Sequence, residues 1–142
     1  MEVGFIYAMS AAVTWGLVYT IDQKILYTVS PMALLFIHSV ISAIIVLPFI
    51  FFNNGSIKNL ALSGNLNIAL ILVSAILATL ANFFIFAGIK NSNASTISII
   101  EISYPFFVVA FSYPIFRSTP NIYFFIGGIL IALGSIIILK LA

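Results

Sequence analysis

Charged side chains are scarce in this chain, and cysteine is absent. Asp, Glu, Lys and Arg make up 6% of its 142 residues, whereas hydrophobic residues make up 63%. A soluble domain of this length could not hide so much apolar surface, because its polar coat would be too thin. Without cysteine the chain has no disulfide and no thiolate for catalysis. The natural solvent of this chain is therefore lipid, and the sequence predicts an integral membrane protein.

Other absences exclude further classes of function. One histidine and no cysteine make a metal cluster improbable, and no cofactor is expected. The sequence contains no Gly-rich phosphate loop and no GxSxG-like serine context, so we expect no enzymatic activity. The formal net charge of +2 is small and scattered, which gives no basis for a nucleic-acid partner.

Apolar runs fill most of the sequence, and most charged residues fall near their ends. Each run is close to the ~20 residues that an α-helix needs to cross ~30 Å of hydrocarbon. Lipid offers no water to unpaired backbone groups, and the alternating pattern of a membrane barrel is missing. We therefore predict an all-α bundle of five transmembrane helices, forming a single domain over residues 1–142. The predicted spans are about 4–21, 31–52, 67–89, 96–116 and 122–139.

The connections between these spans are short. The longest one is expected over about 53–66, and residues 117–120 are expected to separate the last two spans. Asp22 and Lys24 are expected to end the first helix as exposed anchors. The loops are too short to form a soluble domain.

The distribution of lysine and arginine leaves the orientation open. Five spans put Lys58 and Arg117 on one side, and Lys24, Lys90 and Lys140 on the other. Orientation normally follows a bias in these residues between loops, and two against three is almost none. One reading is a single orientation set by other features. The other is dual topology, in which copies insert both ways and pair antiparallel, so that two identical chains build an inverted repeat.

Glu101 is the only acid clearly inside an apolar run. A charge near the bilayer centre costs about 2.5–3.5 kcal/mol on insertion scales, so such a residue is by default a functional hypothesis. Desolvation disfavours the ionised carboxylate, and we predict that Glu101 binds a proton or a cationic group. Alternatively, Glu101 reaches interfacial water or pairs with His38. His38 itself is predicted either to relay protons with Glu101 or to hydrogen-bond a neighbouring helix.

Aromatic and amide side chains extend this predicted site. Trp15, Tyr19 and Tyr104 lie at levels where they could face a cavity with both a ring surface and a polar tip. Asn82 could bind substrate, although a hydrogen bond between helices is the simpler role.

Prolines and glycines predict where the helices bend and pack. Pro105 and Pro114 each remove a backbone donor from the fourth span, which indicates a static kink or a functional hinge. Small residues let helices in lipid approach closely, and Gly16, Gly127 and Gly134 are predicted packing positions. A dimer seam on the fifth helix is the alternative reading of the last two.

Several motifs together resemble one repeat of the EamA type in the drug/metabolite transporter superfamily. The first helix has the Trp15-Gly16 pair followed by Lys24, and the segment 30–34 resembles the family's entry to the second helix. Pro105 interrupts the fourth helix where the family has a proline. The fifth helix has the family's glycine-spaced pattern, formed by Gly127, Leu130, Ile131 and Gly134. The chain departs from the family at His38, where arginine is common, at Ser118, where glutamate is usual, and at Tyr104, where many members have an acid.

The resemblance implies a transporter of a metabolite, an amino acid or a drug, often an exporter. Many members fuse two such repeats, so a lone repeat implies a homodimer. The expected location is a prokaryotic plasma membrane. Two alternatives stay open: a non-transporting accessory subunit of another membrane complex, and a flippase subunit for lipid-linked sugars.

Overall fold

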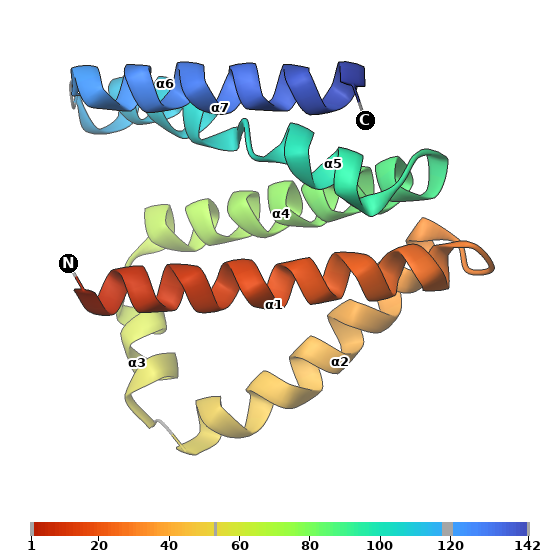
Figure 1. Cartoon of the computed structure of the whole chain (residues 1–142). Helices are drawn as coiled ribbons and strands as arrows, with labels where there is room; N and C mark the ends of the chain where they lie inside the picture. Colours follow the sequence, from red (N-terminus) through yellow and green to blue (C-terminus); the bar gives the residue numbers. More distant parts are fainter. Residues whose placement is uncertain (1, 53, 118–120, 142) are drawn as a thin grey trace. The chain divides into compact units, whose positions relative to one another are not determined.

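The computed structural model describes residues 2–52, 54–117 and 121–141, and every regular element in these ranges is an α-helix (Figure 1). The helices of this described part are α1 (Glu2–Leu26), α2 (Pro31–Phe52), α3 (Asn54–Leu62), α4 (Asn65–Asn91), α5 (Ala94–Glu101), α6 (Tyr104–Phe116) and α7 (Ile122–Leu141). Five stretches are long and apolar enough to cross a membrane, namely α1, α2, α4, α7 and the α5–α6 pair. The predicted all-α membrane fold is confirmed.

Helix α1 is longer than its apolar run. It ends at Leu26, and the backbone N–H of Val29 closes the end by donating to the carbonyl of Ile25 at 2.9 Å. Lys24 lies in its last turn, where a cation interacts favourably with the helix dipole. Asp22 therefore lies inside the helix, and only 1% of its surface is exposed. The expectation that Asp22 is an exposed anchor is wrong.

The connection between the second and third spans contains a helix that the sequence analysis did not predict. Helix α3 has nine residues, which cover ~14 Å at 1.5 Å per residue and cannot cross a bilayer. It contacts α2, and this packing offsets its polar, glycine-containing sequence. Gly64 then turns the chain into α4. Its φ is 89°, a backbone conformation that residues with a Cβ rarely adopt.

The fourth span is broken into α5 and α6 (Figure 1). Ile102 and Ser103 separate the two helices, and the N–H of Ser103 reaches back only three residues, to the carbonyl of Ile100 at 3.1 Å. Pro105 has no N–H for the carbonyl of Glu101, and its ring would clash with that carbonyl in a straight helix. The break thus falls directly after Glu101.

Farther along the same span, α6 continues past Pro114 and ends at Phe116. Arg117 closes the helix in the left-handed conformation, and its N–H donates to the carbonyl of Tyr113 at 2.9 Å. Residues 118–120 of the predicted joint before the fifth span, Ser118 among them, lie outside the described residues. So does residue 53 in the earlier connection.

The chain forms two compact units, each described by itself. The first comprises α1 up to Thr20 together with the chain from Ser92 onward, and the second comprises residues 21–91. In the second unit the ends of α1, α2 and α4 bury an apolar core formed by Leu26, Leu34, Leu35, Phe86 and Ile89. The Lys90 ammonium donates to the Val29 carbonyl at 2.9 Å, which ties the α1–α2 turn to the end of α4.

In the first unit a glycine of α7 lies close to an aromatic ring. A Cβ placed on Gly128 of α7 would lie 2.3 Å from the ring of Phe106 on α6. A Cβ at Gly16, Gly127 or Gly134 would meet no atom of the described residues within 4 Å. The packing role expected for these three glycines stays a prediction.

Candidate functional site

Glu101 contacts a tyrosine of the first span. The Tyr19 hydroxyl donates a hydrogen bond to Oε2 of Glu101, and both residues belong to the first compact unit. Tyr19 is buried, with 7% of its surface exposed, and Glu101 is half-buried. Two of the predicted site residues, 82 positions apart in sequence, therefore meet at the break in the fourth span.

Local structure fixes the carboxylate from the α5 side. The side chain of Asn93 accepts a hydrogen bond from the Thr96 N–H at 2.7 Å and caps the start of α5. Glu101 is the last residue of this helix, which has eight residues. The cap at one end and the break at the other therefore define where the acid can lie.

Trp15 joins this cluster through α1. It lies one turn before Tyr19, and the two ring centroids are 5.5 Å apart with the planes tilted by 60°. Half of the Trp15 surface, 49%, is exposed in the single chain. The structure thus brings Trp15, Tyr19 and Glu101 together. Tyr104 begins α6 and is largely exposed, so its role in a cavity stays a prediction.

Hydrogen-bond acceptors gather around the end of α5. A helix C-terminus carries partial negative charge from carbonyls that have no partner within the helix. One of these, the Ile99 carbonyl, receives the Ser135 hydroxyl of α7 at 3.4 Å. The carbonyl of Glu101 receives no N–H from Pro105. A carboxylate beside such carbonyls favours a proton or a cation as its ligand.

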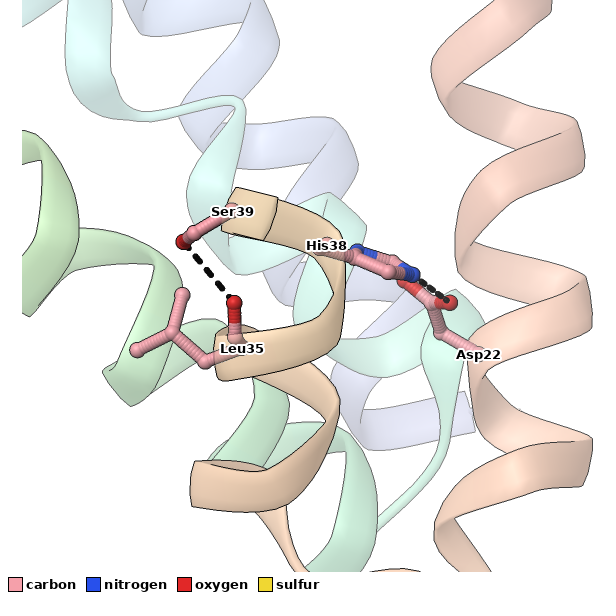
Figure 2. A network of polar contacts seen from close by, with 4 residues as sticks. All are labelled: Asp22, Leu35, His38 and Ser39. Carbon is pink, nitrogen blue, oxygen red and sulfur yellow. Dashed lines mark hydrogen bonds and ion pairs between the residues drawn. The ribbon is translucent and has the colours of Figure 1, made fainter. Parts of the chain in front are cut away.

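A second polar cluster lies in the other compact unit (Figure 2). His38 of α2 points toward Asp22 of α1, with 3.5 Å between its Nε2 and the carboxylate Oδ1. The edge of the Phe86 ring meets the imidazole at a centroid distance of 5.5 Å. Ser39, beside His38, donates its hydroxyl to the Leu35 carbonyl of its own helix at 2.8 Å (Figure 2).

Asp22 is the buried acid of this second cluster. Among the described residues its Oδ2 atom has no hydrogen-bond partner, while 37% of the His38 side chain is exposed. The predicted relay of His38 with Glu101 stays a prediction, because the two residues belong to different units. Asn82 is half-buried on α4, and its role also stays a prediction.

Sequence reasoning missed the polar contacts of Asp22 and Ser135. Asp22 stands near the end of an apolar run beside a lysine, a pattern typical of a solvated helix end. Its position three residues after Tyr19, on the same face of a helix, was the available signal. Ser135 gave no comparable signal, because a hydroxyl in a membrane helix usually bonds its own backbone, as this one also does at 2.9 Å.

These features define a class: a polytopic helical membrane protein with an acid at a break in one span. The model of the EamA-like transporter family matches residues 2–140, which is nearly the whole chain. The chain therefore belongs to the EamA-like transporter family, and the resemblance drawn from its motifs is confirmed. It is a membrane transporter of the drug/metabolite kind. No curated protein and no solved structure matches the chain.

Proposed function

We propose that this chain exports small molecules as an antiparallel homodimer, and that Glu101 of each protomer binds a proton or a cationic substrate group in exchange. The observation that supports this most is the Tyr19–Glu101 hydrogen bond at the α5–α6 break. Membership of a transporter family supports the general activity. The expected location is a prokaryotic plasma membrane.

The chemistry of the break favours a substrate that carries a cationic group, such as an amine. The Glu101 carboxylate and the C-terminal carbonyls of α5 are all hydrogen-bond acceptors, and they attract the same kind of ligand. Trp15 adds a ring face one turn from Tyr19, and a cation over such a face gains about 0.5–2 kcal/mol. A proton competes for the same carboxylate, so proton binding would release the substrate.

The homodimer proposal is supported by the lysine and arginine residues around the five spans. Transporters of this kind often build their path between two inverted halves, which two copies of one chain inserted in opposite directions would supply. Two cations on one side and three on the other favour neither orientation strongly. Rocking of two inverted protomers around paired Glu101 residues would then give alternating access.

Transport by reconstituted protein tests the role of Glu101. Vesicles of phosphatidylethanolamine and phosphatidylglycerol, loaded with a pH-sensitive dye, are exposed to a panel of aromatic amines and amino acids under a pH gradient. We expect one or more of these compounds to drive a proton flux with the native protein and not with Glu101→Gln. Undiminished proton-linked transport by Glu101→Gln would remove Glu101 from the mechanism.

Tyr19→Phe tests the geometry of the site more finely. Hydrogen bonds to charged groups contribute about 1.5–3 kcal/mol, so we expect roughly 10- to 100-fold weaker substrate binding. Tyr7→Phe is the matched control, because Tyr7 lies on the same helix with 72% of its surface exposed. Equal effects of the two substitutions would contradict the proposed contact.

Oligomeric state separates this proposal from its rivals. Purification in mild detergent should give a self-dimer that cross-links within the bilayer. A chain that stays monomeric until a different membrane protein is added would favour an accessory subunit. Binding of a polyprenyl-phosphate carrier in preference to amines would favour a flippase subunit.

A further inference from the structure

The Asp22–His38 cluster contains a buried carboxylate with one unpartnered oxygen. The Asp22 side chain has 2% of its surface exposed, and its Oδ2 atom has no hydrogen-bond partner among the described residues. Leaving a carboxylate buried and unpaired costs several kcal/mol, so such groups take up a proton or a counter-charge. The only charge-bearing side chain at ion-pair distance among the described residues is His38.

Other ionisable groups near this cluster are engaged or exposed. On α1, Lys24 is exposed, and Tyr19 donates its hydroxyl to the acid of α5. On α4, Lys90 donates to a backbone carbonyl of the α1–α2 turn. The His38 imidazole, which carries a charge only when it is protonated, is therefore the partner left for the Asp22 carboxylate.

We propose that Asp22 and His38 form a second membrane-embedded proton site, in which the pair holds one proton in common. Without that proton the pair carries one negative charge, and with it the pair is neutral. The proton forms either an N–H bond on the imidazole, which gives the carboxylate a counter-charge, or an O–H bond at Oδ2, which neutralises the carboxyl group. A low-dielectric surrounding favours the neutral state.

The geometry gives this proton a route. The carboxylate is buried, whereas 37% of the His38 side chain is exposed, so the imidazole, 3.5 Å from Oδ1, connects the carboxyl group to the surface of the chain. Phe86, itself buried, holds the ring by an edge contact. The Ser39 hydroxyl does not take the place of the imidazole in this route, because it donates its proton to the Leu35 carbonyl within α2 (Figure 2).

A role of this proton in transport rests on the proposed function, but its binding does not. His38 is the only histidine in the chain, so ¹⁵N-histidine labelling gives one assignable imidazole in nuclear magnetic resonance spectra of the protein in bilayers. We expect the ¹⁵N chemical shifts of the imidazole, which report where its protons lie, to change in Asp22→Asn, because that substitution removes the partner that shares the proton. In Lys24→Gln these shifts should stay as in the native protein, because Lys24 is exposed and its charge is screened. Unchanged imidazole shifts in Asp22→Asn would overturn the shared proton.

Infrared spectroscopy provides a second readout on a variant that keeps the acid. In His38→Gln the proton of the pair has only Asp22 to bind, whereas the double variant Asp22→Asn/His38→Gln lacks that carboxyl group and keeps the other acids of the chain. We therefore expect the carboxylic-acid stretching band that grows on acidification to be larger in His38→Gln by the contribution of one carboxyl group. Bands of equal size in the two variants would also overturn the proposal.

Transport measurements then separate the shared proton of Asp22 and His38 from the proposed transport function. If the pair serves coupling, Asp22→Asn retains substrate exchange at equal pH while losing uptake driven by a pH gradient. A shared proton in a chain that transports none of the tested compounds would leave this site standing and remove the proposed function. Transport that needs Glu101, with imidazole shifts of His38 in Asp22→Asn that match those of the native protein, would do the reverse.

Discussion

The contact between Gly128 and Phe106 makes a quantitative prediction about the packing of α7 on α6. A Cβ at position 128 would lie 2.3 and 2.4 Å from two carbons of the Phe106 ring, whereas carbon atoms in contact prefer about 3.5–4.0 Å. The ring must therefore withdraw by roughly 1 Å or more in Gly128→Ala. Such overpacking typically costs about 1–3 kcal/mol.

Gly127→Ala and Gly134→Ala are the matched references, because a Cβ at either position meets no atom within 4 Å. All three changes share the gain of roughly 0.5–1 kcal/mol from replacing glycine in a helix, so differences between the variants report packing alone. We expect Gly128→Ala to unfold about 1–3 kcal/mol more easily than either reference.

Equilibrium unfolding in mixed detergent–dodecyl sulfate micelles, followed by circular dichroism, measures these differences. The double variant Gly128→Ala/Phe106→Ala should show strong non-additivity, because removing the ring removes the clash. The reasoning would be refuted if Gly128→Ala and Gly127→Ala agreed within about 0.5 kcal/mol, the usual error of additivity for independent sites.

Two further predictions concern the fourth span. Pro105 is near the start of α6, where a missing N–H is tolerated, so Pro105→Ala should change the free energy of unfolding by less than about 1 kcal/mol. The new N–H can bond the Glu101 carbonyl, and transport in the vesicle assay should fall; normal transport would mean that the break is dispensable. Asn93→Ala loses the cap on the Thr96 N–H and should destabilise the protein by ~1 kcal/mol in the same unfolding assay. Asn91→Ala serves as its control, since the Asn91 side chain donates to the Ala87 carbonyl of its own helix and caps no helix start, and equal effects would contradict the capping role.

Hydropathy predicted the five spans well because lipid imposes one strong condition on every residue of a span. The ends of the helices were harder to predict, since they depend on local hydrogen bonds and on packing. Helix α1 runs on to Leu26 because no proline or glycine stops it and Lys24 suits its last turn. Helix α3 forms against α2, which no local pattern in its polar sequence indicates.

The candidate site was predictable where one residue type is rare. An acid inside an apolar run identified Glu101, and a polar-tipped aromatic residue in the first span identified Tyr19. Their pairing is a long-range contact, and periodicity carries no information about which residues of different helices meet. The same limit explains why Asp22 was read as an anchor, since its burial depends on where α2 places His38.

Glycine spacing illustrates the limit in another way. A seven-residue interval correctly puts Gly127 and Gly134 on one face of α7, but it does not say what lies opposite that face. In the described chain it is Gly128, on the adjacent face, that meets an aromatic ring.

The most direct test of the antiparallel homodimer is the topology of the chain in intact cells. Lys58→Cys lies between the second and third spans and Lys90→Cys lies in the last turn of the third, so the two sites are at opposite sides of the membrane. The native chain has no cysteine, which removes any background from the protein itself. With a membrane-impermeant thiol reagent, we expect each site to be labelled in about half of the molecules, as dual insertion requires. Labelling of one site in all molecules and of the other in none would contradict the account, because every copy would then face the same way.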